Sequence, residues 1–161
     1  MTDIDPKRDF LRHCLATLAY RAQRTLSNAP EGFAEFHAHI GVRTPGQILA
    51  HLGDLLDWAR SMVEGNPQWR ESQPLAWDKG IARFYAGLKA LDEYLASGNS
   101  MQAPAEKLFQ GPVADALTHV GQLAMLRRAA GSPVKGENYY VAEISVGNVG
   151  ANQPVPVRQF D

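Results

Sequence analysis

Apolar residues recur at three- and four-residue steps in four separate stretches of the chain, which is the spacing of one face of an α-helix. The first stretch predicts a helix over about 5–27, followed by a loop over 28–43 that is rich in Gly and Pro. Its apolar positions are Phe10, Leu11, Cys14, Leu15, Leu18, Ala22 and Leu26. One side of this helix should therefore face a core.

The second helix has a clear start signal. Thr44 can cap it, Pro45 suits the first helical position, and Gln47 completes a capping box three residues after Thr44. Gly65 and Pro67 predict where it stops. Its apolar stripe consists of Ile48, Leu52, Leu55, Leu56, Ala59 and Met62.

Two further helices follow. The third is predicted from Trp77 to the Gly98-Asn99 pair, and a short helical turn over 105–109 precedes the fourth. We expect Gly111-Pro112 to begin the fourth helix, and Arg127 and Arg128 to occupy its last turn, where cations favour the negative helix end. It should end at 131–133, a Gly-Ser-Pro sequence.

Beyond residue 133 the helical period is lost. Residues 139–146 are compatible with a short extended stretch, and the remainder predicts an irregular tail. Four amphipathic helices of about 20 residues favour an all-α four-helix bundle. We therefore predict a single domain over 1–161, with the bundle at about 5–131 and the tail at 132–161.

Composition and charge narrow the setting. The 161 residues are 45% hydrophobic and 20% charged, which is ordinary globular usage. A net charge of -1 gives no electrostatic reason to expect nucleic acid or an anionic membrane as a partner. The single cysteine, Cys14, cannot form an internal disulfide, and the N-terminus lacks the pattern of a signal peptide. With no apolar run of about 18 residues, these features favour a cytoplasmic protein without a membrane span.

Three polar residues occupy comparable positions on two of the predicted helices. His51 lies at the margin of the second stripe, and His119 lies at the corresponding margin of the fourth. Asp115 precedes His119 by four residues, so the two side chains share one helix face. If the two helices are neighbours, these three groups can bind one metal ion.

Each of these residues also has an ordinary structural interpretation. A histidine at the edge of an apolar stripe is usually a packed ring with one hydrogen bond. Asp115 is close to the predicted start of its helix, where a carboxylate is favourable without any metal. Only the combination of His51, Asp115 and His119 predicts a metal site.

The remaining candidates are weaker. His37 and His39 lie in a loop that we expect to be solvated, and His13 should be exposed. Asp54 either orients a histidine or is a solvated carboxylate, and Trp58 is expected to pack. The sequence leaves open whether Tyr139, Tyr140 or Glu143 of the tail approaches the ion.

The stretch 44–52 (TPGQILAHL) and the stretch 119–123 (HVGQL), followed by Arg127, resemble the DinB-like superfamily of metalloenzymes. Members of that family are four-helix bundles with one histidine from the second helix and two from the fourth. His51 matches the first position and His119 the last, whereas Asp115 replaces the usual middle histidine. The resemblance covers about 5–131 and implies metal ligands at these three positions.

Two histidines and one carboxylate suit zinc, nickel or iron as the divalent metal. The resemblance implies a metal-dependent enzyme acting on a small molecule, such as an S-transferase that uses a low-molecular-weight thiol, or a hydrolase. Metal-bound water or thiolate would be the nucleophile, and no catalytic side chain is assigned. The alternatives are a non-enzymatic bundle that binds a small ligand or a metal, and a bundle whose histidines hold no metal. We also expect a homodimer.

Overall fold

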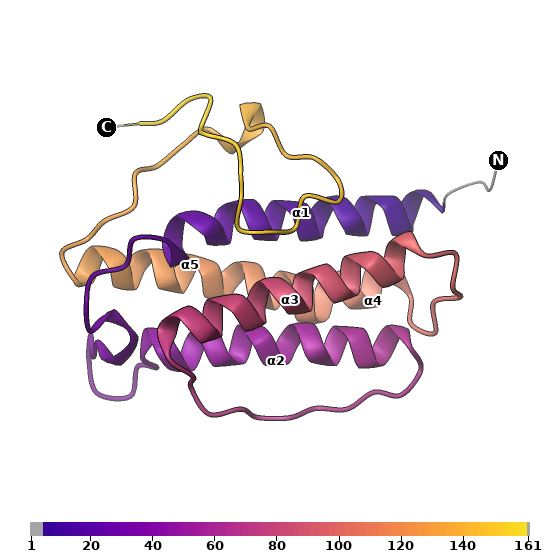
Figure 1. Cartoon of the computed structure of the whole chain (residues 1–161), viewed down its shortest axis with the longest axis horizontal. Coiled ribbons are helices and arrows are strands. Elements are labelled where there is room, and N and C mark those ends of the chain that lie inside the picture. Colours follow the sequence, from indigo (N-terminus) through magenta and orange to yellow (C-terminus); the bar gives the residue numbers. More distant parts are fainter. Residues whose placement is uncertain (1–4, 161) are drawn as a thin grey trace.

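The computed structural model describes residues 5–160, and these residues fold as an all-α structure (Figure 1). The predicted fold class is thereby confirmed. Residues 1–4 and 161 of the predicted domain lie outside the described part. The helices are α1 (Pro6–Leu26), α2 (Pro45–Val63), α3 (Trp77–Ala96), α4 (Ala105–Leu108) and α5 (Ala114–Ala129).

The four long helices of the described chain lie side by side as a bundle (Figure 1). Helix α1 packs on α3 and α5, and α2 packs on the same two helices. Their apolar stripes meet in one core, whose fully buried side chains include Leu15, Leu18, Leu52, Leu56, Phe84, Leu88, Leu91 and Leu123. Each such side chain contributes about 1.5–3 kcal/mol through its removal from water.

The predicted capping box sets the start of α2. The backbone N–H of Gln47 donates to Thr44 Oγ1 over 3.2 Å, and the Gln47 side-chain oxygen accepts from the Thr44 N–H over 2.9 Å. These two bonds satisfy amides that have no partner inside the helix. They also fix the position of His51, about two turns further along α2.

Helices α2 and α3 approach each other closely because α3 carries glycine where it meets α2. A Cβ atom added to Gly80 would lie 2.7 Å from Leu49 Cδ2, and one added to Gly87 would lie 3.0 Å from Leu56 Cβ. The two glycines are two helical turns apart, as are the two leucines that face them. Larger residues at either position would push α3 away from α2.

The predicted start of the fourth helix is wrong. Helix α4 begins at Ala105 and continues through a π-helical turn, Phe109–Val113, directly into α5, so Pro112 lies inside a continuous helical segment. Proline has no N–H and clashes with the carbonyl four residues before it. The wider π-helical turn accommodates that ring, and it ends immediately before the turn that carries Asp115.

The expected extended stretch at 139–146 is also not found. Tyr139–Val141 forms a 3-10 turn, and the β pairing between residues 5 and 160 is limited to one isolated bridge, Glu137 with Gln159. The tail lies against α1, on the side opposite α2 (Figure 1). It is attached there by the Tyr20 hydroxyl, which donates to Glu137 Oε1 over 2.6 Å.

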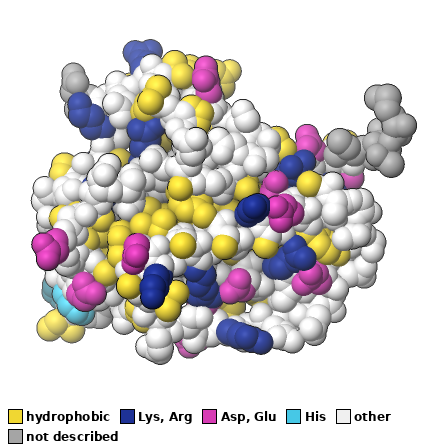
Figure 2. All heavy atoms as spheres, viewed as in Figure 1, with side chains coloured by type: hydrophobic (Ala, Val, Ile, Leu, Met, Phe, Trp, Pro, Cys, Tyr) yellow, Lys and Arg dark blue, Asp and Glu magenta, His cyan; other side chains and the backbone are white. Residues whose placement is uncertain are grey.

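On the face of the molecule that Figure 2 shows, acidic and basic side chains are interspersed, and a band of apolar side chains crosses the middle. This distribution agrees with the near-zero net charge. None of the helices between residues 5 and 160 combines the length and the apolar character that a membrane crossing requires.

Candidate metal centre

The three predicted ligands converge in the folded chain. His51 comes from α2, and Asp115 and His119 come from successive turns of α5, the helix that packs beside α2. One potential ligand atom from each residue lies within 4.8 Å of the other two. Two atoms bound to one tetrahedral zinc are about 3.4 Å apart. His51 Nε2 and Asp115 Oδ2 already lie 3.3 Å apart, so the cluster has the dimensions of a metal site.

A backbone hydrogen bond orients His119. Its Nδ1–H donates to the Asp115 carbonyl over 2.8 Å, and the same nitrogen lies 3.3 Å from Asp115 Oδ1. Because a carbonyl oxygen can only accept, this bond puts the proton on Nδ1 and leaves the lone pair on Nε2. Many metal-binding histidines are held this way, with one ring nitrogen on the backbone and the other available to an ion.

The electrostatic setting keeps His51 neutral. Burial lowers the pKa of His51, the hydrogen bond with Asp115 opposes that effect, and the positive charge of Arg43 lowers the pKa further. A neutral imidazole is the form that binds a metal. The two histidine side chains are 16% and 12% exposed and Asp115 is 45% exposed, so the cluster is sheltered but open to solvent on the carboxylate side.

Sequence reasoning missed the residues that surround His51. The loop between α2 and α3 places Trp69 edge-on to the His51 ring, with 5.7 Å between the ring centroids. Beside His51 is a polar cavity of about 190 Å³, which Arg43 and Gln47 also line. A tryptophan within a polar loop was the only signal for the first contact, and nothing in the sequence pointed to the cavity.

Both expectations for Asp54 are wrong. Its side chain is 2% exposed, it accepts hydrogen bonds from Arg83 Nη2 over 2.7 Å and from the Ser72 N–H over 2.9 Å, and neither bond involves a histidine. Burial alone would raise the pKa of Asp54, but the bonds from Ser72 and Arg83 hold it below the ordinary value. Asp54 therefore joins α2, α3 and the loop between them.

The other histidines remain outside the cluster. His37 and His39 are exposed in their loop, as predicted, whereas His13 is partly buried rather than exposed. Trp58 packs against the core and against Trp69, with ring centroids 5.6 Å apart, as expected.

The tail residues in question lie elsewhere. Tyr139 packs edge-on to Tyr20 of α1, with 6.3 Å between ring centroids, and Tyr140 is 96% exposed. Glu143 is exposed and does not belong to the His51, Asp115 and His119 group.

Comparisons with known proteins give no relative: no family model matches the chain, and neither the curated proteins nor the solved structures include a significant match. Functional inference therefore rests on the geometry of the chain itself.

Proposed function

We propose that this chain is a metal-dependent enzyme of the DinB-like superfamily, in which His51, Asp115 and His119 bind a divalent zinc, nickel or iron ion. The observation that carries the proposal is the convergence of three ligand-type side chains from two helices within 4.8 Å. Both imidazoles are mostly buried, which distinguishes this group from a cluster of solvated surface charges. The chemistry of the donor set fits the proposed ions.

Three protein ligands leave coordination positions free, which is typical of catalytic rather than structural metal sites. A divalent ion held by these residues would lower the pKa of a water molecule or thiol bound to it. His51 and His119 would hold the ion through ring nitrogens, and Asp115 through a carboxylate oxygen. A small-molecule substrate would occupy the polar cavity beside His51, where Arg43 and Gln47 offer hydrogen-bond donors. The reaction would be a thiol-dependent S-transfer or a hydrolysis.

Metal analysis of the purified protein tests whether these three residues bind a metal ion. We expect about one divalent ion per chain, and loss of most of it in His51→Ala and in His119→Ala. His39→Ala is the matched control, because that histidine is exposed and outside the cluster. Equal metal content in the wild-type protein and His51→Ala would refute the assignment.

Assays of enzymatic activity test whether the metal site is catalytic. The metal-loaded protein is incubated with small thiols and electrophiles, and separately with simple esters and amides. Turnover that requires the metal and disappears in His119→Ala supports the enzyme. Metal binding without turnover of any of these compounds would favour a metal-binding bundle instead.

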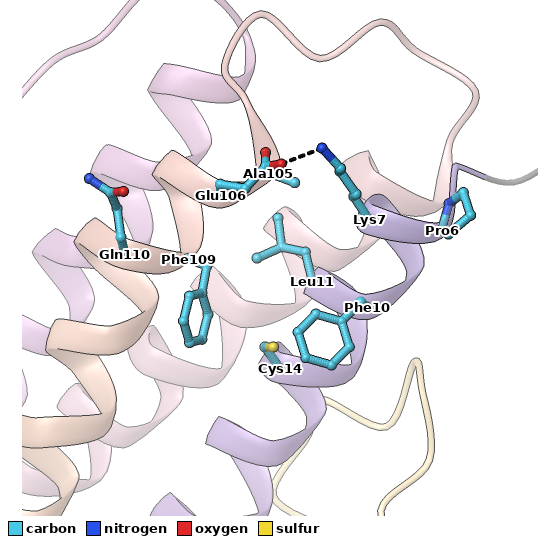
Figure 3. A pocket seen from close by; sticks show the side chains of 9 residues that line it. All are labelled: Pro6, Lys7, Phe10, Leu11, Cys14, Ala105, Glu106, Phe109 and Gln110. Atoms are coloured by element: carbon cyan, nitrogen blue, oxygen red, sulfur yellow. Dashed lines mark hydrogen bonds and ion pairs between the residues drawn. The ribbon is translucent and has the colours of Figure 1, made fainter.

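One observation favours a second function, the binding of a small apolar molecule. A cavity of about 460 Å³ lies between the first half of α1 and the α4 region, a size typical of ligand pockets. Figure 3 shows the Phe10 and Phe109 rings on either side of Cys14, with the Lys7–Glu106 ion pair at the rim. Burial raises the pKa of the Cys14 thiol, so the cavity holds no activated nucleophile.

This second function predicts that small apolar compounds raise the unfolding temperature without being converted. Phe10→Ser should remove that effect, because the Phe10 ring lines the cavity. The substitution should not disturb the core, because the ring is 64% exposed. The exposed rings of Phe10 and Phe109 are also compatible with the proposed homodimer. Light scattering that gives a monomeric mass would refute the dimer.

A further inference from the structure

A second cavity, of about 210 Å³, lies where the tail covers the junction of α1 and α5. Four basic side chains line it: Arg21 and Arg24 from α1, Arg128 from the end of α5, and Lys135 from the tail. The cavity is on the α1 side of α5, whereas His119 is directed toward α2. Its chemistry is therefore separate from that of the metal centre.

One of these cations is already neutralised. Arg24 Nε lies 3.6 Å from Glu137 Oε2, and Glu137 is buried and accepts the Tyr20 hydroxyl bond. Arg24 also donates from Nη2 to the carbonyl of Pro154 over 3.4 Å. These contacts hold the tail on α1, and the residues that line the cavity include no carboxylate.

The other three cations have no acidic partner within residues 5–160. No carboxylate oxygen of that range lies within 4.0 Å of a nitrogen of Arg21, Arg128 or Lys135. The Arg21 guanidinium stacks on the Tyr139 ring, with 4.1 Å from its carbon to the ring centroid. Stacking uses the face of a guanidinium and leaves the N–H groups at its edge free to donate.

The position of these charges restricts what the cavity can hold. Three positive groups from three different segments surround one small space, so the ligand must accept hydrogen bonds in several directions and carry more than one negative charge. A phosphate group does both, and arginine binds it through paired N–H donors. A carboxylate has one charge in one plane and would satisfy at most two of these cations.

Size and the remaining wall point to a small molecule. At about 210 Å³ the cavity is smaller than the roughly 300–1,000 Å³ of typical ligand pockets, which suits a phosphate with a short carbon substituent. Leu117, Val120 and Val134 form an apolar part of the wall next to the cations. We propose that this cavity binds the phosphate group of a small phosphorylated metabolite or of inorganic phosphate.

Calorimetric titration of the full chain with inorganic phosphate, at constant ionic strength set with chloride, tests the proposal. We expect saturable binding at one site, weakened about tenfold in Arg128→Gln and in Lys135→Gln. Both side chains are exposed and donate no hydrogen bond within the described residues, so these variants should keep the fold. Circular dichroism and the unfolding temperature in phosphate-free buffer verify this.

Two matched variants locate the binding. Lys79→Gln removes one exposed positive charge that does not line the cavity, and Arg43→Gln removes the arginine beside His51. Both should bind phosphate as the wild type does. Lost affinity in Arg43→Gln, with no change in Arg128→Gln and Lys135→Gln, would place the phosphate at the other site and overturn the proposal.

A parallel titration with glycerol 3-phosphate and with glycerol distinguishes the two sources of the phosphate group. Tighter binding of glycerol 3-phosphate than of inorganic phosphate identifies an organic phosphate as the ligand, and the reverse order identifies the free ion. Glycerol should not bind. If neither phosphate binds at millimolar concentration beyond the effect of chloride, the proposal is wrong.

Discussion

The two ends of α5 carry buried or partly buried charged groups with very different surroundings. Near its end, the Arg127 side chain is 5% exposed and donates to five oxygens at 2.9–3.1 Å, on α1, the loop after it and Ser132. Near its start, Asp115 and the two imidazoles approach one another only to 3.3 Å.

The difference separates a structural charge from a candidate ligand. Every donor of Arg127 is matched by a fixed oxygen of the chain, so the protein alone satisfies it. The cluster of His51, Asp115 and His119 has one short hydrogen bond, to a backbone carbonyl. The contacts of its carboxylate are longer: Asp115 Oδ2 lies 3.3 Å from His51 Nε2, and Asp115 Oδ1 lies 3.5 Å from Thr118 Oγ1. A metal cation would give the His51, Asp115 and His119 cluster its missing partner. The oxygens around Arg127 already have a cation, the guanidinium.

The largest effect on stability should come from a substitution of Arg127, near the end of α5. Arg127→Met leaves the carbonyls of Thr25, Ser27 and Asn28 without their donor, and we expect the free energy of unfolding to fall by about 3 kcal/mol or more. The unfolding temperature should then drop by about 6–12 °C. Arg128→Met, at the next and exposed position, is the control and should change stability by about 0.5 kcal/mol or less.

Removal of the metal should lower stability through the cluster near the start of α5, not through Arg127. A ligand at about a hundred times its dissociation constant stabilises a fold by about 2.7 kcal/mol, so a chelator should lower the unfolding temperature of the metal-loaded protein by about 5–10 °C. His119→Ala should show no such shift, and Arg127→Met should retain it. A chelator shift that survives in His119→Ala would contradict the proposed ligand set.

A pair of carboxylate variants makes the comparison within one residue type. The pKa of Asp54 is below its usual value of 3.8 in the folded chain, so this carboxylate stabilises the fold above that pH, and the stability is lost as the pH falls through the lower, folded pKa. We expect Asp54→Asn to lower stability at pH 7 by about 2 kcal/mol, and by less in acid, without loss of bound metal.

Asp115→Asn should do the reverse. Its side chain is 45% exposed, so the metal-free protein should lose about 0.5 kcal/mol or less, while bound metal decreases. Urea unfolding at pH 7 and pH 3 and metal analysis measure both variants. Loss of metal in Asp54→Asn with none in Asp115→Asn would reverse our assignment of the two carboxylates.

The smallest effect should come from the loop over the metal centre. Trp69 is 47% exposed, so Trp69→Phe should change stability by about 0.5 kcal/mol or less. Its ring lies beside His51, and Ni²⁺ bound there should quench the fluorescence of wild-type Trp69. Quenching that is as strong in Trp69→Phe would place the nickel elsewhere.

Much of the helical architecture could be predicted, because its signals are local. The capping box at Thr44 and the apolar stripe of α2 depend on residues at most four positions apart, and both are confirmed. The same spacing put Asp115 and His119 on one face. The π-helical turn at Pro112 was missed because proline is equally compatible with a helix start, and only the preceding turn of α4 decides between them.

The candidate site was predictable only in part, because the helical pattern gives the face of each ligand but not its neighbour. Trp69 reaches His51 through the path of a loop, which no period describes. Asp54 was interpreted as solvated or as an aid to a histidine because its partner Arg83 lies 29 residues away on another helix.

The sequence by itself determined the presence of the long helices, the cap of α2 and the side on which each potential ligand lies, since these follow from interactions within one or two turns. Only the tertiary structure decided which charges meet. His51 and Asp115 are 64 residues apart, and Tyr20 and Glu137 are 117 apart. Whether such groups pair with the protein or stay available to a ligand depends on helix packing, because electrostatic and hydrogen-bond partners are set by distance in space.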